Sequence, residues 1–579
     1  MDNAALAHVL GQIGDLLEIK GANLFKIRAY RNASETVATS AERVADLSEV
    51  ALLAIPGIGK DLAAKIRELA QTGSLAYHQA LLTEVPESLL ELLQLQGLGP
   101  KTVALLYAVL NIRTIDELEA AATAGHLKEL KGLGPKKERL VLRAIDERRR
   151  RAGRHLVADV HAVAHVLIEH LQQAVDGGTF VPVGSVRRGC ETSGDVDILA
   201  IGVDPSVRDH FVTFPGVDRI LGHGATKCSI LLKDAVQADL RVIPIESAGA
   251  ALQYFTGSKP HNIALRDRAV QRGLKLNEYG LFRVADDERV AGETEQGVYA
   301  ALGLSFIPPE LRENHGEIAA AEAGALPDLI DRTHIRGDLH CHTTATDGQA
   351  DIETMARAAQ AAGLEYLAIT DHSQALAMAN GLDEHRALDH ARAIRAINDR
   401  LDGITLLAGI ECDIRPDGQL DLAEDCLAEL DIVIASVHSA FGQPEETMTA
   451  RILRAMESPV VDAIGHPTGR LLLRREPYRV NVEDLIDAAA RFGVALEINC
   501  QVDRLDLNDA HARLARDRGV KLIISSDAHS PASFELLRWG ILVARRAWAR
   551  PTDVLNTLPL EELKKRLRRH ARPEPEARP

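Results

Sequence analysis

The sequence is poor in the features that mark secreted, membrane-spanning and base-stacking proteins. Its six cysteines, at positions 190, 228, 341, 412, 426 and 500, form no CxxC pair, which excludes a disulfide framework or a zinc ribbon and favours a reducing cytoplasm. Residues 1–21 are amphipathic without a basic flank, and no run of about 18 apolar residues occurs, so we expect neither a signal peptide nor a membrane span. Aromatic residues make up 3%, which leaves few platforms for stacking single-stranded bases.

The length of the chain predicts several domains rather than one. At about 100 to 200 residues per domain, 579 residues correspond to about three to five domains. Hydrophobic residues (46%) and charged residues (26%) occur in the proportions usual for globular proteins, which excludes a collagen-like, coiled-coil or largely disordered chain.

Charge is distributed unevenly along the chain. The net charge of −16 should repel polyanions at long range and, taken alone, argues against a nucleic-acid-binding protein. Residues 126–155, however, carry 11 Lys and Arg against 4 Asp and Glu, a local charge of +7, whereas 1–125, 156–334 and 335–579 are each acidic. A solvated helix face is the simplest interpretation of such a basic segment. Whether the segment binds nucleic acid instead depends on the motifs that lie beside it.

The apolar pattern changes along the chain and predicts its organisation. Residues 1–150 contain short helices separated by glycine turns, and strands follow between about 180 and 245. From residue 335 onward strands alternate with helices, which indicates a parallel α/β unit. We predict two all-helical domains (1–90 and 91–155), an α+β domain (156–245), a mixed domain (246–318), a linker (319–334), an α/β domain (335–570) and a disordered tail (571–579).

A short motif occurs three times in the helical part: IPGIGKDLAAKI from Ile55, LQGLGPKTVALL from Leu95 and LKGLGPKKERLV from Leu130. Its glycines permit a tight turn, and the helix that follows leaves free N–H groups that bind a phosphate oxygen without contacting a base. A single copy is more often an ordinary turn, but three copies, each followed by lysine, favour helix-hairpin-helix contacts with a nucleic-acid backbone. The candidate DNA-binding residues are Gly57, Gly59, Lys60, Gly97, Gly99, Lys101, Gly132, Gly134 and Lys136.

Lys65 lies one helical turn beyond the first copy of this motif. The simplest interpretation is an exposed lysine on an amphipathic helix. If cationic neighbours lowered its pKa, its amine could instead attack an aldehyde sugar and form a Schiff base. The residues alone leave both interpretations open.

The strand-rich centre contains GSVRRGCETSGDVDIL at residues 184–198 and QADLRVIP around Asp239. Asp195 and Asp197 are two residues apart on an apolar strand, so their carboxylates share one face and repel each other unless a divalent cation lies between them. With Asp239 they would form a two-metal site that aligns a hydroxyl and a phosphate for in-line displacement. A structural acidic strand is the alternative, but the preceding GSVRRG, whose N–H groups and guanidinium groups would hold a triphosphate, favours the metal site.

Together, the hairpins, GSVRRGCETSGDVDIL, QADLRVI and YFTGSKPHNIALR (254–266) resemble a family X DNA polymerase over residues 1 to about 318. The resemblance implies a helix-hairpin-helix domain (1–90), fingers (91–155), a nucleotidyltransferase palm (156–245) and a thumb (246–318). It implies two Mg²⁺ or Mn²⁺ ions held by Asp195, Asp197 and Asp239, with Asp239 as the base for the primer hydroxyl. The residues implied to bind the nucleotide or the minor groove are Gly184, Ser185, Arg188, Gly194, Tyr254, Phe255, Gly257 and Asn262.

The same resemblance places Lys65 at the lyase nucleophile of the animal members of the family. The sequence departs from those members nearby, since Asp61 stands at a position that is usually basic and Phe25 replaces a histidine near the pocket for the 5'-phosphate. The resemblance thus predicts a lyase activity with Lys65 as its nucleophile, but the neighbouring residues depart from the family pattern that this activity needs.

Nine candidate metal ligands lie at or just beyond predicted strand ends in the last part of the chain. They are His340, His342, Asp347, His372, Glu411, His438, His466, Asp527 and His529. The C-terminal ends of the strands of a parallel β/α barrel converge on one rim, so these residues would meet there. Each histidine alone is more often structural, but so many ligands at one topological position favour a multinuclear metal site.

The motifs DLHCHT, TDH, SVH, GHP and SDAH resemble the PHP (polymerase and histidinol phosphatase) domain. The resemblance implies a distorted β/α barrel of about seven strands that binds up to three Zn²⁺, Mn²⁺ or Fe ions and cleaves phosphoesters, with Glu411 and Asp527 helping to activate a hydroxide. Its expected activity is a 3'-5' exonuclease, with cleavage at abasic sites or of blocked 3' ends as further candidates. Arg470, which follows GHP, is a candidate for binding the phosphate.

We therefore predict a cytoplasmic, monomeric bacterial DNA polymerase that fills gaps during base excision repair or end joining and carries a C-terminal nuclease. Its predicted partners are gapped or nicked double-stranded DNA and dNTPs. The affinity for DNA should be modest and salt-sensitive, because only the basic segment and the hairpins oppose an acidic background. Two alternatives are a phosphatase for small phosphoesters that the front half tethers to DNA, and a non-catalytic DNA-binding scaffold; the intact sets of aspartates and barrel ligands argue against the scaffold.

Overall fold

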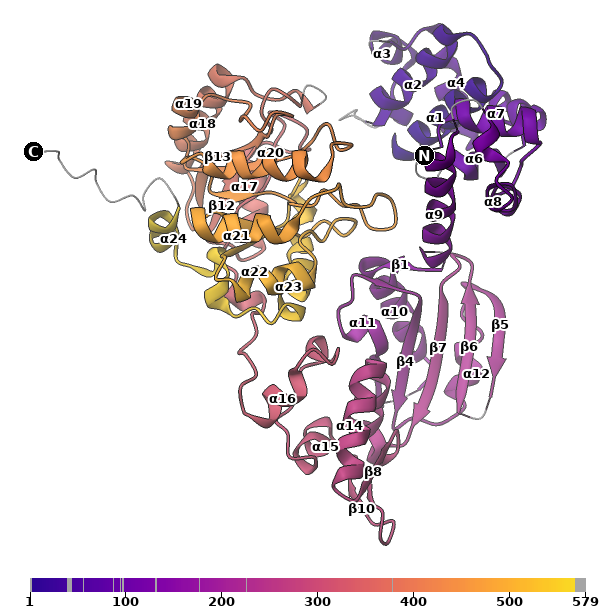
Figure 1. Ribbon diagram of the computed structural model, residues 1–579. Helices are drawn as coiled ribbons and strands as arrows, with labels where there is room; N and C mark the ends of the chain where they lie inside the picture. The colour runs from indigo at the N-terminus through magenta and orange to yellow at the C-terminus, as the bar shows by residue number, and fades with distance from the viewer. Residues whose placement is uncertain are drawn as a thin grey trace, which may run out of the picture. The chain divides into compact units, whose positions relative to one another are not determined.

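The computed structural model describes residues 3–567 apart from 39–43, 56, 87, 94, 96–97, 131–132, 152, 176, 225 and 377–378 (Figure 1). The predicted DNA-binding residues Gly97 and Gly132 and the predicted tail 571–579 therefore lie outside the described residues. The chain divides into two compact units, residues 1–152 and 153–579.

The first unit is helical because its apolar residues recur at three- and four-residue spacing and its turns are rich in glycine. A single core of mostly aliphatic side chains, to which Leu6, Leu10 and Ile13 of the first helix belong, holds the helices together. The helices are α1 (Asn3–Ile19), α2 (Leu24–Ala38), α3 (Glu49–Ala54), α4 (Lys60–Thr72), α5 (Ala76–Glu84), α6 (Ser88–Leu93), α7 (Pro100–Leu110), α8 (Ile115–Thr123) and α9 (Pro135–Arg151).

The three copies of the glycine motif share one backbone hydrogen bond among their described residues. In each copy an apolar residue donates its N–H to the carbonyl three residues earlier: Ile58 to Ile55 (3.1 Å), Leu98 to Leu95 (3.1 Å) and Leu133 to Leu130 (3.0 Å). The helices α4, α7 and α9 begin directly after Gly59, Gly99 and Gly134. The free N–H groups of each helix therefore lie at the turn, and the repeat in the sequence is a repeat in the structure.

The second unit begins with a mixed five-stranded sheet in the order β2-β4-β7-β6-β5. Its strands are β2 (Thr179–Pro182), β4 (Asp195–Ile201), β5 (Val217–His223), β6 (Lys227–Leu232) and β7 (Gln237–Ile243). The strands β4 and β7 are parallel, and the other neighbours are antiparallel. The remaining elements of this part are β1 (His155–Leu156), α10 (Val157–Gln172), α11 (Gly184–Arg187), β3 (Thr192–Ser193) and α12 (Val207–Phe211).

The two faces of this sheet carry different helices because side chains alternate along β4. Val196, Ile198 and Ala200 pack with α10 and α12 in one apolar cluster. Leu199 and Ile201 pack on the other face, against α13 (Ala248–Thr256). The positions of Asp195 and Asp197 in the same alternation therefore place both carboxylates on this second face.

The next part combines four helices with a three-stranded antiparallel sheet in the order β10-β9-β8. The helices are α13 (Ala248–Thr256), α14 (Lys259–Gln271), α15 (Glu295–Ala301) and α16 (Glu317–Glu322), and the strands are β8 (Leu274–Asn277), β9 (Gly280–Arg283) and β10 (Arg289–Ala291). A compact core around Leu265, Leu281 and Tyr299 joins these helices and strands.

The last part of the second unit is a sheet of seven parallel strands in sequential order. The strands are β11 (Gly337–Asp338), β12 (Tyr366–Ile369), β13 (Thr405–Asp413), β14 (Ile432–Ser436), β15 (Ala463–Ile464), β16 (Ala495–Asn499) and β17 (Leu522–Ser525). A bridge between Cys341 and Ala528, just beyond the first and last strands, nearly closes the sheet into a barrel. The helices are α17 (Ile352–Ala361), α18 (Glu384–Asn398), α19 (Glu424–Ala428), α20 (Glu445–Glu457), α21 (Val482–Phe492), α22 (Asp509–Asp517), α23 (Leu537–Arg546) and α24 (Leu560–Arg566).

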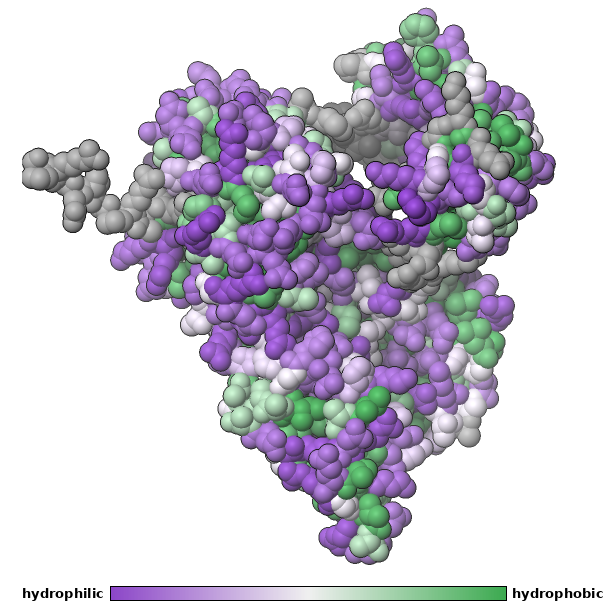
Figure 2. Space-filling view, in the orientation of Figure 1, coloured by the Kyte–Doolittle hydropathy of each residue, from purple (hydrophilic) through white to green (hydrophobic). Residues whose placement is uncertain are grey.

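These parts confirm the predicted fold class of a helical first region, an α+β middle and an α/β barrel of seven strands. The alternation of strands and helices after residue 335 predicts the barrel because each parallel strand needs a crossover connection. None of the helices that the structure describes has the length and apolar character needed to cross a membrane. Figure 2 shows hydrophilic side chains over most of the visible surface of the barrel, so its apolar residues serve its own core.

Candidate active sites

Nine side chains meet at the C-terminal rim of the barrel, and they come from six of its seven strands or the loops that follow. His340, His342 and Asp347 follow β11, His372 follows β12, Glu411 lies in β13, His438 follows β14, His466 follows β15, and Asp527 and His529 follow β17. The structure thus brings together all of the barrel ligands that the sequence predicts.

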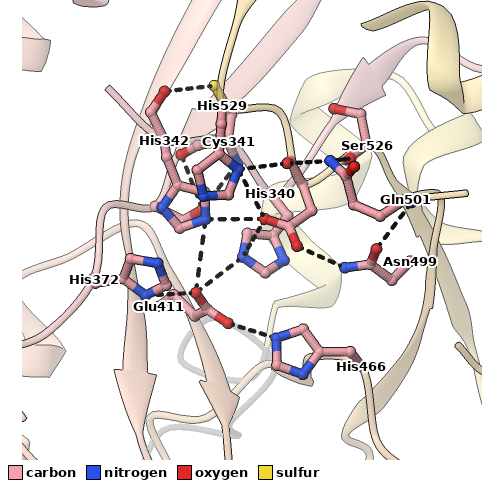
Figure 3. Close-up of polar contacts among 12 residues, drawn as sticks. His340, Cys341, His342, His372, Glu411, His466, Asn499, Gln501, Ser526 and His529 are labelled. Atoms are coloured by element: carbon pink, nitrogen blue, oxygen red, sulfur yellow. Dashed lines mark hydrogen bonds and ion pairs between the residues drawn. The ribbon is translucent and has the colours of Figure 1, made fainter. Parts of the chain in front are cut away.

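Glu411 is the centre of this cluster. Its Oε2 lies 2.8 Å from His372 Nδ1 and 3.3 Å from His340 Nε2. Its Oε1 lies 3.0 Å from His466 Nε2 and 3.2 Å from His438 Nε2. The carboxylate is 1% exposed, and Figure 3 shows it between the rings of His372 and His466. His342 Nε2 lies 3.6 Å from Oε2 as well, so one buried anion contacts five imidazoles.

Two further carboxylates extend the cluster. Asp527 Oδ1 lies 3.1 Å from His342 Nε2, and Asp347 Oδ2 lies 3.4 Å from His372 Nε2 and 3.5 Å from His529 Nε2. Among the described residues, ligand atoms converge to within 4.8 Å in three groups, which are His342, Asp347, His372 and His529; His340, His342 and Asp527; and His372, Glu411 and His438. Groups that share ligands in this way suit a multinuclear centre.

The ring nitrogens of the cluster fit metal coordination better than hydrogen bonding. Within the described part of the chain, the buried nitrogens without a well-formed hydrogen bond include His340 Nε2, both ring nitrogens of His342, His372 Nδ1, His438 Nδ1 and His466 Nδ1. An unpaired buried polar atom costs about 1–3 kcal/mol, so this concentration requires an external partner. Imidazole and carboxylate together fit a divalent transition metal.

Without a metal, the carboxylates of the cluster hold protons on several histidines. Burial lowers the pKa of His372 and of His438, but Glu411, together with Asp347 at His372 and Asp413 at His438, outweighs it and raises these pKa values to about 9 and about 10. Burial and the neighbouring His529 and His372 lower the pKa of His342 to about 4. Protons thus balance the buried anions where a bound cation would otherwise do so.

Residues without a sequence motif hold the ligands in place. Glu497 of β16 accepts hydrogen bonds from His340 Nδ1 (2.8 Å) and from the N–H of His466 (2.6 Å), which turns His340 Nε2 toward the cluster. Asn499 Nδ2 donates to Asp527 Oδ2 (3.0 Å). His466 (φ 27°) and Asp527 (φ 50°) have left-handed backbone conformations, which cost about 1–3 kcal/mol and persist where a functional arrangement over-determines them.

The three predicted catalytic aspartates lie on two adjacent parallel strands of the first sheet. Asp195 and Asp197 project from one face of β4, and Asp197 is paired in register with Asp239 of β7. Lys227 of β6 places its Nζ 2.5 Å from Asp239 Oδ2. Among the described residues, these carboxylates do not converge as closely as the barrel ligands do, and the Lys227 ammonium balances one of them.

Burial and mutual repulsion raise the pKa of two of these aspartates. Burial raises the pKa of Asp197 to about 6, and the Asp195 and Asp239 carboxylates add to the effect. Burial and the Asp239 carboxylate also raise the pKa of Asp195. A divalent cation would relieve the same repulsion, so these residues fit the predicted metal site.

The predicted nucleotide-binding loop lies beside these aspartates. A side-chain carbon at Gly184 would lie 3.1 Å from Asp197 Oδ2, so α11 begins next to the carboxylate. The hydroxyl oxygens of Ser185 and Ser193 are 2.5 Å apart, and Gly194 connects Ser193 to β4. The loop and the aspartates therefore form one continuous surface.

The predicted sugar-pocket residues form a second group next to this loop. Arg188 Nη1 would lie 3.2 Å from a side-chain carbon at Gly257. Asn262 Nδ2 donates to the carbonyl of Tyr254 (2.6 Å), and the rings of Tyr254 and Phe255 meet edge to face with centroids 5.1 Å apart. The structure therefore brings α11, the end of α13 and α14 together around the predicted site.

The glycines of the hairpins are open to the outside. Gly57 has a φ of +85°, which favours glycine. Gly59, Gly99 and Gly134 would meet nothing within 4 Å if they carried a side-chain carbon. Because packing within the described unit does not require glycine at these three positions, close approach of an external partner to the helix N-termini is the better explanation. The lysines Lys60, Lys101 and Lys136 are exposed beside them.

Lys65 lies on α4 in contact with Asp61. Its Nζ is 2.5 Å from Asp61 Oδ2 and 4.6 Å from the centre of the Tyr77 ring. Burial lowers the pKa of Lys65, but Asp61 and Tyr30 together outweigh burial and hold the pKa above its usual range. A Schiff-base nucleophile has to be a neutral amine, so Asp61 opposes the chemistry that the sequence suggests for Lys65.

Arg470 of the barrel pairs with Glu191, which lies between α11 and β3. Its Nη2 lies 2.6 Å from Glu191 Oε2, its Nη1 lies 3.3 Å from Glu191 Oε1, and its Nε donates to the carbonyl of Arg504 (2.9 Å). To bind a phosphate, Arg470 would have to exchange the ion pair with Glu191, so its phosphate contact stays a prediction.

The chain is similar to several known proteins. Family models match residues 1–75 (helix-hairpin-helix domain), 89–147 (SAM-like helix-hairpin-helix tandem), 251–313 (DNA polymerase beta thumb) and 338–501 (PHP domain). The DNA polymerase/3'-5' exonuclease PolX of Bacillus subtilis (strain 168) is 36% identical over 573 residues, 98% of this chain and 100% of that protein. A probable phosphatase of Thermoanaerobacter sp. (strain X514) is 31% identical over 38% of this chain and 89% of its own length. A probable phosphatase of Shewanella sp. (strain MR-4) is 33% identical over 33% of this chain and 75% of its own length.

Metal binding by the barrel should release protons. Against the lowering effect of burial, the Glu411 carboxylate raises the pKa of His340, His372 and His438, so these side chains carry protons near pH 7. Coordination requires neutral imidazole. Adding Zn²⁺ to chelator-treated protein in weak buffer with a pH indicator should release about two to four protons per chain, and the apparent affinity should rise with pH.

The exposed His385 provides the matched control for this titration. His385→Ala should release as many protons as the unmodified protein, because His385 lies on α18 away from the cluster with its side chain 85% exposed. His438→Ala should release fewer. Zn²⁺ binding without proton release would contradict the protonation of the metal-free cluster.

Asp197→Asn should stabilise the metal-free protein at neutral pH. Because the fold raises the pKa of Asp197 from 3.8 to about 6, ionisation of this carboxyl destabilises the native state. The destabilisation is absent below about pH 4 and complete above about pH 6. In EDTA, thermal unfolding should show a Tm a few degrees higher for the variant at about pH 7.5 and equal Tm values near pH 4. The exposed Asp218→Asn should change neither, and a lower Tm for Asp197→Asn at about pH 7.5 would refute the argument.

Proposed function

Because the chain belongs to the family of the DNA polymerase/3'-5' exonuclease PolX, we propose that it is a gap-filling DNA polymerase that also removes nucleotides from 3' ends. The observation that carries the proposal is similarity over nearly the whole chain, together with two separate and intact sets of metal-type ligands in the second unit. Nucleotide addition is assigned to the aspartates of the first sheet, and 3'-5' cleavage is assigned to the barrel cluster.

Nucleotide addition would take place at the start of the parallel strands β4 and β7, where the three aspartates lie. Asp195, Asp197 and Asp239 would hold two Mg²⁺ or Mn²⁺ ions, which align the primer hydroxyl with the phosphate and offset the charge that develops. Asp239 is the proposed base, since Gln237 Nε2 (3.2 Å) and Lys227 Nζ (2.5 Å) fix its buried carboxylate. Its oxygen is therefore oriented before a substrate binds.

The loop before β4 would bind the triphosphate. Gly184 lets the backbone approach Asp197, Ser185 offers a hydroxyl and an N–H, and Arg188 offers a guanidinium. The ring pair of Tyr254 and Phe255 would form the wall against the sugar. The loop and the ring pair would thus position the nucleotide, while the aspartates of β4 and β7 would hold the metal ions and accept the proton.

Cleavage of the 3' end would take place at the rim of the barrel. The nine ligands would hold up to three Zn²⁺, Mn²⁺ or Fe ions, which activate water and offset the charge of the phosphodiester. Glu411 and Asp527 would hold these ions together with the histidines, because each carboxylate contacts at least two imidazoles. Glu497 and Asn499 keep these ligands oriented.

Gapped or nicked duplex DNA is the proposed substrate, together with dNTPs. The hairpin turns would grip the backbone through helix N-termini, which needs little net positive charge and reads no sequence. Short gaps of this kind arise in base excision repair and end joining, so we place the protein in DNA repair in the cytoplasm, acting as a monomer. The lyase role of Lys65 stays a prediction, and the ion pair with Asp61 argues against it.

A phosphatase for small phosphomonoesters is the second candidate function. It is favoured by the probable phosphatases that are 31% and 33% identical to part of this chain. In that case the front half would only tether the barrel to DNA. The intact aspartates and the nucleotide loop favour the polymerase.

Two single substitutions should separate the two proposed activities. Asp197→Ala should reduce templated dNTP addition to gapped DNA by about a thousandfold or more, because it removes a shared metal ligand, while 3'-5' cleavage continues. His340→Ala should abolish 3'-5' cleavage while synthesis continues. Both activities would be measured on one end-labelled primer, with and without dNTPs, in Mg²⁺ and in Mn²⁺.

The same variants distinguish the candidate functions. If His340→Ala loses hydrolysis of a small phosphomonoester but keeps cleavage of a 3'-ended oligonucleotide, the barrel is a phosphatase and the nuclease assignment fails. Synthesis that persists in Asp197→Ala would disprove the polymerase site. Asp218→Asn, on the exposed side of β5, should leave both activities unchanged.

The hairpins should bind DNA through their glycines. The double variant Gly99→Ala, Gly134→Ala should fold with little change in Tm, since neither added carbon meets an atom within 4 Å, yet its Kd for gapped duplex should rise about tenfold. Lys101→Ala should chiefly flatten the dependence of Kd on salt. Gly222→Ala, on β5, is the control, and an unchanged Kd in the double variant would show that the hairpins do not hold DNA.

A further inference from the structure

The proposed nucleotide loop is held from the barrel side by helix α23. A side-chain carbon at Gly189 would lie 3.2 Å from Leu542 Cδ2 of α23. At the end of the same helix, Arg546 Nη1 donates to the carbonyl of Arg188 (3.0 Å). Residues nearly 360 positions apart in the sequence therefore meet at the loop that would bind the triphosphate.

The guanidinium of Arg188 is already occupied in this structure. Its Nε lies 2.9 Å from Glu313 Oε1, its Nη1 donates to the carbonyl of Thr256 (2.5 Å), and its Nη2 lies 3.8 Å from Cys190 Sγ. The side chain is 14% exposed. For Arg188 to bind a triphosphate, at least the contact with Glu313 has to be exchanged for a phosphate oxygen.

Arg546 shares the same carboxylate oxygen. Its Nη1 lies 3.0 Å from Glu313 Oε1, and its Nε and Nη2 lie 2.8 Å and 2.7 Å from Asp509 Oδ2. Burial raises the pKa of Glu313, but Arg188 and Arg546 outweigh it and lower that pKa, so the carboxylate is an anion at neutral pH. One anion therefore lies between a guanidinium of the nucleotide loop and a guanidinium of the barrel.

We propose that Glu313 competes with the incoming triphosphate for Arg188, and that Arg546 of the barrel weakens this competition by sharing the Glu313 carboxylate. The inference rests on the proposed function, in which Arg188 contacts the triphosphate. It makes Arg546 a positioning residue for nucleotide binding, although it lies in the part of the chain that carries the nuclease ligands.

The direction of the effect follows from charge balance. With Arg546 present, Glu313 divides its attraction between two guanidinium groups, so release of Arg188 leaves the half-buried carboxylate still paired. Without Arg546, release of Arg188 would leave that half-buried carboxylate without a guanidinium partner, which is costly. Removal of Arg546 should therefore weaken nucleotide binding, and removal of the Glu313 charge should strengthen it.

The test measures nucleotide binding without chemistry. The Kd of the correct dNTP is determined for the full-length protein on gapped DNA whose primer ends in a dideoxynucleotide. Arg546→Gln should raise this Kd about fivefold to tenfold, and Glu313→Gln should lower it about threefold or more. In the double variant Arg546→Gln, Glu313→Gln, the Arg546 substitution should have no further effect, so its Kd should match that of Glu313→Gln.

Steady-state synthesis provides a second readout. With an extendable primer, Arg546→Gln should raise KM for dNTP with little change in kcat, since the aspartates of the sheet are untouched. If Arg546 only supported the loop mechanically, Arg546→Gln would raise Kd equally in the presence and absence of Glu313. That additive result, or an unchanged Kd in both single variants, would overturn the proposal.

Two further variants separate this inference from the proposed function. Arg545→Gln is the matched control, because Arg545 lies on the same helix but pairs with Glu310 (2.7 Å), and its Kd should be unchanged. Arg188→Gln should raise Kd by more than Arg546→Gln does. An unchanged Kd in Arg188→Gln would refute the triphosphate assignment itself, whereas a raised Kd with no coupling between Glu313 and Arg546 would refute only the competition.

Discussion

Carboxylates that a fold brings together away from water have to be balanced by positive charge, and this constraint accounts for much of the polar architecture of the second unit. The first sheet meets it with Lys227 against Asp239 and with a raised pKa at Asp197. The barrel meets it with protonated imidazoles around Glu411. In both places the balancing groups are ones that a divalent cation can replace, which is why buried anions here indicate catalysis rather than packing.

The register and order of the strands determine where these charged side chains lie. Parallel pairing of β4 with β7 sets Asp197 opposite Asp239, and sequential parallel strands carry the barrel ligands to one rim. The remaining freedom is removed by neighbours, as when Glu497 turns His340. Burial of apolar side chains in the barrel core stabilises the fold and offsets the cost of holding these charges in place. The same burial offsets the strain of the left-handed conformations of His466 and Asp527.

The sequence predicts the groups that follow local rules and misses those that depend on tertiary contact. The barrel ligands are predictable because each lies at a strand end, and the hairpins are predictable because one motif recurs. Lys227, Glu313, Glu497 and Arg546 carry no spacing signal, since their partners lie on other elements and as far as 358 residues away. Arg470 shows the same limit, because its position beside GHP suggests a phosphate contact but gives no sign of the ion pair with Glu191.

The acidic character of the chain follows from the same constraint. Ligands for divalent cations are necessarily acidic or neutral, so a chain with two metal-type sites accumulates negative charge that bound ions would offset locally. DNA binding then cannot rely on a broadly positive surface. Backbone N–H groups at the turns before α4, α7 and α9 offer an alternative, because they attract phosphate without changing the net charge. A net charge of −16 is thus compatible with a DNA-binding chain provided that its contacts are few, local and sensitive to salt.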